Sequence, residues 1–234
     1  MTTHEVSAAG PGSSPLQFWS YFTDHRPEVL GWLADHAWLS VLPVVVGLLV
    51  ALPLGWLAQR YRWLYTPLLT TTGLFYTIPS IALFVLVPPL LGLQSLDPLQ
   101  VPIALSVYST ALLVRVVADG LRSVPEEVNL AATAIGYGRA RRLATVELPI
   151  AAPVIIAGLR VVTVSNVSMV AIAGTIGMAN LGQLFVVGFQ LSTPDPYYPP
   201  IVLGIGLCVL LALALDAALV LLTRVLTPWR RAVA

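Results

Sequence analysis

The sequence predicts an all-α membrane protein with about five transmembrane helices. Of its 234 residues, 57% are hydrophobic and only 10% are charged, whereas a soluble domain carries about 25% charged residues. A chain so poor in charge needs a bilayer to accept its apolar surface. Five stretches reach the length of about 20 mostly apolar residues that a spanning helix needs. They run from Trp38 to Ala58, Thr66 to Leu93, Val101 to Val117, Ile150 to Ile176 and Ile201 to Leu226.

The region before the first span differs from it in composition. Residues 1–15 are polar and rich in Gly, Ser and Pro, which predicts a disordered tail. Residues 16–36 mix aromatic side chains such as Trp19 with charged ones such as Asp24, and this mixture is typical of an interfacial helix. The transmembrane domain is then expected to occupy residues 37–229.

The second apolar stretch is longer than one straight span requires and has Pro79, Pro88 and Pro89 inside it. Each proline removes a backbone donor, so this stretch is expected to be kinked or broken into two pieces. In lipid a break survives only where protein or a water-filled path satisfies the freed carbonyl groups. Tyr76, Thr77, Pro79 and Ser80 therefore either line such a path or form a packed kink, and Tyr76 could offer its ring face to a quaternary ammonium cation.

Several classes of activity are excluded by composition. Every basic residue is Arg, and without Lys the chain cannot contain a Walker A phosphate loop, so it is not expected to hydrolyse ATP alone. A net charge of +1 gives no sign of the basic surface with which proteins bind nucleic acids. The single Cys208 excludes internal disulfides and Cys-cluster metal sites. The three His residues show no metal-ligand spacing, so no catalytic or metal-binding residue is expected.

The arginines between and after the spans gather in loops on one side of the membrane. They follow the first, third and fifth spans, where they include Arg60 and Arg62, Arg139 to Arg142, and Arg230. Because basic loops stay in the cytoplasm, five spans place the N-terminus outside the cell and the C-terminus in the cytoplasm.

The longest of these loops, residues 125–149, predicts two short helices joined at glycines. Pro125 followed by two glutamates is a typical helix start, with acids at the positive end of the helix dipole. Gly136 and its neighbours interrupt this helix. A second helix is expected to begin at Arg139 and to be closed by Pro149.

The spacing in this loop resembles the EAA loop of ABC importer permeases. Ala131 and Ala132 are followed after three residues by Gly136, and then at the family's spacing by an aliphatic residue and the Leu-Pro pair at 148–149. Leu130 departs from the pattern, which usually has Glu there. The resemblance implies a coupling helix that docks on a partner ATPase, whereas the alternative is an ordinary connector between spans. The coupling residues it implies are Glu126, Glu127, Ala131, Ala132, Gly136, Arg139, Leu148 and Pro149.

A wider resemblance, over most of the chain, is to the glycine betaine/carnitine/choline (osmoprotectant) permeases. It is carried by residues 36–40, 52–55, 76–83, 157–160, Asp216 and 226–228. The family implies a type I ABC importer in the bacterial plasma membrane, with a second permease chain, identical or homologous, and a separate external substrate-binding protein. ATP and Mg would bind to the two partner ATPase chains, so this chain is expected to hold no cofactor and to be no enzyme itself.

Polar side chains inside the predicted spans are candidates for a translocation path, because charge at membrane depth normally faces a partner or a pathway. Arg160 either lines the path or forms an ion pair or reaches toward the cytoplasm, and Asp216 is expected to pair with an Arg of a neighbouring helix. Thr163 and Asn166 either line the pore or form interhelical hydrogen bonds, which are common in membranes.

Together these features predict the transmembrane permease of an ATP-driven osmoprotectant importer that works by alternating access. One alternative is an ABC permease for another small solute, such as methionine or another amino acid. The other is a secondary transporter without an ATPase, for which inverted repeats and paired broken helices would be expected.

Overall fold

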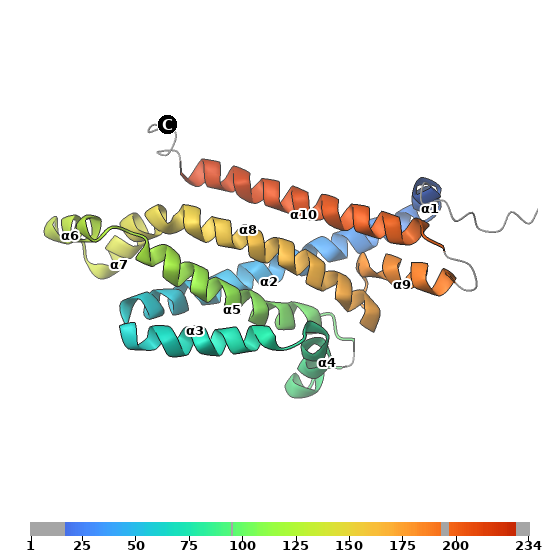
Figure 1. Ribbon diagram of the computed structural model, residues 1–234, viewed down its shortest axis with the longest axis horizontal. Helices are drawn as coiled ribbons and strands as arrows, with labels where there is room; N and C mark the ends of the chain where they lie inside the picture. The colour runs from blue at the N-terminus through green and yellow to red at the C-terminus, as the bar shows by residue number, and fades with distance from the viewer. Residues whose placement is uncertain (1–16, 95, 193–196, 228–234) are drawn as a thin grey trace, which may run out of the picture.

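The computed structural model describes residues 17–94, 96–192 and 197–227, and the regular structure in these ranges is helical (Figure 1). The helices are α1 (Phe18–Asp24), α2 (Arg26–Arg60), α3 (Arg62–Thr77), α4 (Ser80–Leu91), α5 (Gln100–Arg122), α6 (Glu126–Ala134), α7 (Arg139–Arg142), the π-helical turn η2 (Leu143–Glu147), α8 (Leu148–Ala173), the 3₁₀ turn η3 (Gly174–Ile176), α9 (Gly182–Leu191) and α10 (Pro199–Leu226).

The helices that are long and apolar enough to cross a membrane agree with the predicted number of spans. Within the described ranges they are α2, α5, the run Arg139–Ile176 that contains α8, and α10. The pair α3 and α4, bent by 99°, makes a fifth if it is counted as one span. Figure 1 places α6 and α7 at one end of an elongated bundle and α1 and α9 toward the other.

The N-terminal region differs from its prediction. The predicted tail, residues 1–15, lies outside the described residues, as do residues 228–229 at the predicted end of the domain. In place of one separate helix over residues 16–36, α1 ends at Asp24 and α2 runs on from Arg26 through the first span. Pro27 in the first turn of α2 favours a helix start there, and no proline follows before Pro43 to end the helix.

The length of α2 shows that it extends beyond the hydrocarbon layer. Its 35 residues span about 52 Å at 1.5 Å per residue, against about 30 Å of hydrocarbon. The interfacial position of residues 16–36 therefore stays a prediction, and residues 26–36 belong to a helix that is continuous with the first span.

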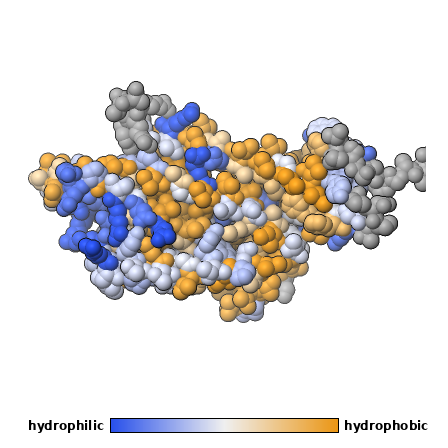
Figure 2. Space-filling view, viewed as in Figure 1, coloured by the Kyte–Doolittle hydropathy of each residue, from blue (hydrophilic) through white to orange (hydrophobic). Residues whose placement is uncertain are grey.

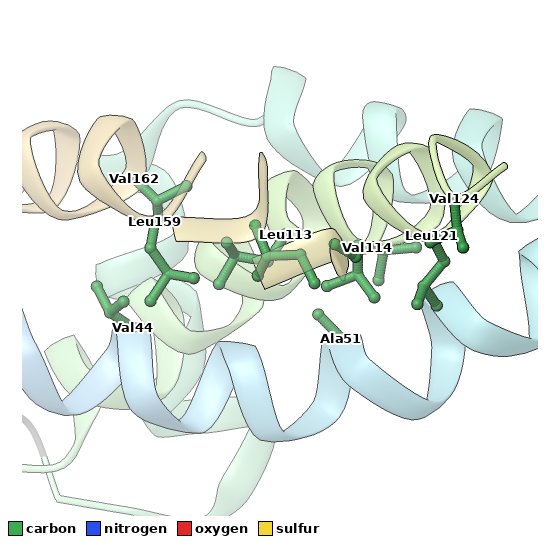
Figure 3. Packing of buried hydrophobic residues seen from close by; sticks show 11 residues of the cluster. Val44, Ala51, Leu113, Val114, Leu121, Val124, Leu159 and Val162 are labelled. Carbon is green, nitrogen blue, oxygen red and sulfur yellow. The ribbon is translucent and has the colours of Figure 1, made fainter. Parts of the chain in front are cut away.

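The core is built where α2 packs against α5 along a row of small residues. Gly47, Ala51 and Gly55 lie four residues apart on α2 and are all buried. A methyl group on Gly47 would lie 2.6 Å from Ser109 Cβ, and one on Gly55 would lie 2.7 Å from Val117 Cβ. Small residues permit such close approach of membrane helices. Figure 3 shows the result, with side chains of α2, α5 and α8 interdigitating in one apolar cluster.

The helix α9 was not predicted from the sequence. Its ten residues are too few to cross a membrane. It is positioned by close backbone packing, because a Cβ on Gly182 would lie 2.0 Å from the carbonyl oxygen of Ala171. The side-chain oxygen of Asn180 accepts a hydrogen bond of 2.7 Å from the Gly182 N–H group, which satisfies a donor at the start of the helix.

Candidate functional site

The loop predicted to be functional, residues 125–149, forms a bent projection that we call the elbow. Its first helix, α6, begins where predicted: Pro125 is extended, and Glu126 and Glu127 occupy the exposed first turn. No side chain caps this helix, so the acidic residues contribute by their interaction with the helix dipole.

Gly136 ends α6 in a left-handed conformation, with φ of +88°. The Gly136 N–H group donates to Thr133 O, and the Tyr137 N–H group donates to Ala132 O, both at 3.0 Å. These two bonds form a Schellman motif, which favours glycine because its φ is positive. Gly136 therefore sets the direction in which the chain leaves α6, and no neighbouring atom would meet a methyl group there.

A polar bridge that was not predicted from the sequence holds the elbow in shape. The Arg142 side chain donates from Nε to Glu147 Oε1 at 2.7 Å and from Nη1 to Thr133 Oγ1 at 2.8 Å. Glu147 is buried, so its carboxylate depends on this partner. Arg142 thereby ties α6 to the root of α8. An acid directly before the Leu-Pro pair, five residues after an Arg, was the only available signal in the sequence.

Pro149 does not close the second helix as predicted. The chain remains helical from Arg139 to Ile176, because the π-helical turn η2 lies between α7 and α8. In this turn the Leu148 N–H group donates to Leu143 O, five residues earlier. A π-turn shifts the backbone bonding pattern, which accommodates the missing donor of Pro149 in the first turn of α8. The elbow is therefore joined directly to the fourth predicted span.

Exposed apolar side chains gather near the C-terminal end of α6. Leu130, in the place of the family's usual Glu, is 62% exposed, and Ile135 is 72% exposed. Ala131 is exposed as well, whereas Ala132 is buried toward the rest of the elbow. A small apolar surface at the tip of a projecting helix is suited to docking in a groove. The other predicted coupling residues lie nearer the bundle, with Arg139 exposed and Leu148 and Pro149 half-buried.

The predicted break in the second apolar stretch is present, and it separates two helices. Ile78 and Pro79 are extended between α3 and α4. The hydroxyl group of Tyr108 on α5 donates to the carbonyl oxygen of Ile78, so protein satisfies the acceptor that the break leaves free. Tyr76 stands edge-on to the Tyr108 ring, with centroids 5.9 Å apart. Tyr108 is the partner that the sequence did not identify.

The four residues predicted around this break do not share one environment. Tyr76 is 40% exposed, and Thr77 and Pro79 are also exposed, while Ser80 is half-buried at the start of α4. The Thr77 hydroxyl donates to Leu74 O at 2.7 Å. The exposed members leave room for a path on the outer surface of this chain, next to a kink whose inner side is packed.

Thr163 and Asn166 lie inside the bundle. Their residues are 4% and 2% exposed. The Asn166 amide donates to Ser109 Oγ at 3.0 Å and to Ser40 O at 3.4 Å, which joins α8 to α5 and α2. Thr163 donates to Leu159 O of its own helix at 2.8 Å. Asn166 thus forms interhelical hydrogen bonds, one of the two predicted alternatives, whereas the hydroxyl group of Thr163 bonds within its own helix.

Arg160 and Asp216 form a bidentate ion pair between α8 and α10. Arg160 Nε donates to Asp216 Oδ1 at 2.6 Å, and Nη2 donates to Oδ2 at 2.8 Å. The predicted pairing of Asp216 with an Arg of a neighbouring helix is confirmed. The two side chains stay 42% and 27% exposed, so Arg160 combines a structural pair with access to the surface of the chain.

No metal centre is apparent in the described part of the chain, where no three His, Cys, Asp or Glu side chains come together to hold an ion. His36 is buried, and its Nε2 donates to Val167 O at 3.0 Å. The described site residues thus offer an exposed apolar tip and polar pairs.

Comparison with known sequences gives matches over most of the chain. Residues 43–228 match the family of binding-protein-dependent transport system inner membrane components. The osmoprotectant import permease protein OsmW of Salmonella typhimurium is 37% identical over 89% of this chain and 96% of its own length. The choline transport system permease protein OpuBB of Bacillus subtilis is 32% identical over 86% of this chain and 89% of its own length.

Comparison with solved structures identifies the same architecture. A chain of the MetNI methionine ABC transporter, solved in an inward-facing conformation, has a TM-score of 0.74 at 20% identity, covering 87% of this chain and 98% of its own. A chain of an amino acid ABC transporter solved with histidines has a TM-score of 0.71 at 21% identity, covering 88% and 97%. At these identities the likeness concerns the fold alone.

Proposed function

Because this chain belongs to the family of binding-protein-dependent transport system inner membrane components, we propose that it is the permease of an ATP-driven importer for osmoprotectants such as glycine betaine, carnitine or choline. The chain is a multi-pass inner-membrane transport subunit and not an enzyme. The choice of solute is supported by the curated relatives, which are named as osmoprotectant and choline permeases. A permease for methionine or another amino acid is the second candidate, and only the fold favours it.

Membership of the family implies partners that hydrolyse ATP and deliver the solute. In the proposed complex, two copies of an ATPase, holding ATP and Mg, bind on the elbow side of the permease. A second permease chain and an external binding protein complete the importer. The elbow side is then cytoplasmic, which is supported by the arginines that lie there, since basic loops stay in the cytoplasm.

The observation that carries the coupling role is the rigid connection between the elbow and α8. The apolar tip at Leu130 and Ile135 is free to enter a groove, with Glu126 and Glu127 providing charge around it. Movement of α6 is passed on through the Arg142 bridge and the helix that continues to Ile176. Closure of the ATPase dimer would therefore rotate α8, and the two permease chains would alternate between inward-open and outward-open arrangements.

The translocation path is assigned to the outer surface of the chain, where a second permease would face it. Tyr76, Thr77, Pro79 and Ser80 line it at the break between α3 and α4. The exposed part of the Tyr76 ring is suited to a quaternary ammonium group through a cation–π contact. Arg160 borders the path from α8 and is held in place by Asp216.

The test is ATP hydrolysis by the reconstituted importer. We would purify this chain with candidate ATPase and permease subunits, place the complex in liposomes and measure the hydrolysis that a solute-loaded binding protein stimulates. Gly136→Pro is expected to abolish the stimulation while the chain still inserts, since Pro fixes φ near −65° and removes the N–H donor, against +88° here. Gly138→Ala is the matched control, because Gly138 has φ of −66° and open space around it. Wild-type stimulation in Gly136→Pro would refute the coupling role.

A further inference from the structure

A small polar cleft lies at the root of the elbow, apart from the tip that docks. It has a volume of about 90 Å³ and is lined by Trp56, Gln59, Arg60, Arg139, Arg142 and Glu147. This volume is several times what one water molecule needs. The lining comes from the end of α2 and from α7 and η2, so the cleft forms only when the elbow folds back onto the first span.

The charges in the cleft are unbalanced. Three guanidinium groups meet one carboxylate, and that carboxylate already pairs with Arg142 at 2.7 Å. Neither Arg60 nor Arg139 forms an ion pair with any carboxylate in the described ranges. Arg60 contacts the ring of Tyr61, 5.9 Å from its centroid, which leaves its charge unneutralised. Both guanidinium groups can therefore bind an anion, and guanidinium favours the paired oxygens of a phosphate or carboxylate.

The position of the cleft indicates which kind of anion can reach it. Arg60 is the last residue of α2, and Trp56 lies one turn earlier. Trp is enriched where a transmembrane helix meets the headgroup layer, and the half-buried Trp56 packs against the apolar core at this end of the first span. We therefore expect the cleft to lie near headgroup level. In Figure 1, α6 projects farther from the bundle than α7 and η2 do, and Figure 2 shows a hydrophilic region at this end next to the apolar surface of the bundle.

We propose that the cleft formed by Arg60, Arg139 and Arg142 binds the phosphate group of an anionic phospholipid. The phosphate lies between the Arg60 and Arg139 guanidinium groups, with Trp56 against the adjoining glycerol and acyl region. The excess positive charge favours an anionic lipid over a zwitterionic one, whose ammonium group it would repel. An acidic side chain of a partner protein is disfavoured because the cleft is recessed at the membrane surface, away from the exposed α6 tip.

The bound lipid would connect the end of α2 to the start of α7 and so brace the elbow. That this lipid belongs to the cytoplasmic leaflet, which is rich in anionic lipids in many membranes, rests on the proposed function. Binding of the phosphate itself does not, because the cleft belongs entirely to this chain.

The test is binding of short-chain lipids to the purified permease in detergent, followed by native mass spectrometry. Dioctanoyl phosphatidylglycerol is expected to bind at least tenfold more tightly than dioctanoyl phosphatidylcholine. Arg60→Gln is expected to weaken phosphatidylglycerol binding about tenfold, the loss of one charge-assisted contact. Arg62→Gln removes the same charge two residues away, from a side chain that does not line the cleft, and is expected to change binding less than twofold.

Each contrary result overturns the proposal. Equal binding of the two lipids, or equal effects of the two substitutions, would show that only general surface charge attracts the lipid. Displacement by inorganic phosphate at the same concentration as the lipid would make the cleft a site for free phosphate. Loss of phosphatidylglycerol when the ATPase binds would assign the cleft to that protein. Because the measurement needs no ATP hydrolysis, failure here leaves the coupling role intact, and failure of coupling leaves lipid binding intact.

Discussion

The elbow and the α2–α5–α8 core use their polar and small residues in opposite ways. In the elbow, Gly136 has no neighbouring atom within 4 Å of the position that a methyl group would take, and glycine is favoured there because the backbone adopts a left-handed φ. In the core, Gly47 has an ordinary helical backbone, and glycine is required there because any side chain would clash with α5. The same residue type is thus required for conformation in one region and for volume in the other.

The polar side chains of the two regions differ in the same way. Arg142 binds Thr133 and Glu147 from nearby positions in the chain, so it holds a local shape. Asn166 binds Ser109, 57 residues away, and so holds separate helices together. The bonds of Arg142 are therefore internal to the elbow, while the bond from Asn166 to Ser109 joins two helices of the core.

The largest expected effect tests the volume requirement of the core. Gly47→Leu places atoms where a Cβ alone would already lie 2.6 Å from Ser109 Cβ, and overpacking of this kind costs about 3 kcal/mol or more. We expect loss of folded protein, measured by size-exclusion chromatography after heating in detergent. Gly31→Leu, on the same helix with nothing within 4 Å, is the control. Equal stability of the two variants would show that α2 and α5 are not so close.

A second prediction concerns the partly exposed ion pair between α8 and α10. Arg160→Gln or Asp216→Asn alone leaves one charge without its partner at membrane depth, which is unfavourable. We expect each single variant to lower the yield of assembled importer, and the double variant to recover much of it. Solute uptake per assembled complex separates the roles: if uptake is restored in the double variant, Arg160 acts only through its pair, and if it stays low, Arg160 also borders the path.

A smaller effect is expected where the core hydrogen bond is removed. Asn166→Ala leaves the Ser109 hydroxyl without this donor, and interhelical hydrogen bonds in membranes contribute about 0.6 to 2 kcal/mol. The melting temperature in detergent should fall, while the solute concentration for half-maximal uptake stays at its wild-type value. A changed solute preference at unchanged stability would instead place Asn166 on the path.

The smallest expected effect tests the conformational requirement of the elbow. Gly136→Ala keeps the N–H donor but forces a methyl-bearing residue into the left-handed region, which costs about 1 kcal/mol, or roughly a fivefold shift in an equilibrium. We expect stimulated ATP hydrolysis to fall about fivefold at unchanged melting temperature of the bundle. Gly138→Ala, with a negative φ, should match the wild type. If both variants behave alike, the geometry at Gly136 does not limit coupling.

Features that depend on local chemistry could be predicted from the amino-acid sequence. The apolar lengths predicted the spans, Pro79 predicted the break between α3 and α4, and Pro125 with the glycines predicted the start and end of α6. Each of these features follows from the backbone conformations that one residue allows or from the length of one apolar stretch. None of them requires knowledge of the neighbouring helices.

The partners of most polar side chains, and the points where one helix continues into the next, became known only from the packing of the helices. Asn166 and Thr163 resembled pore residues in sequence, yet they are buried, because the face of α8 that carries them packs against α5 and α2. The helix continues through Pro149 because η2 accommodates the missing donor. A side chain's partner depends on which helices come together, and in a membrane that choice is made by close packing of small residues far apart in the chain.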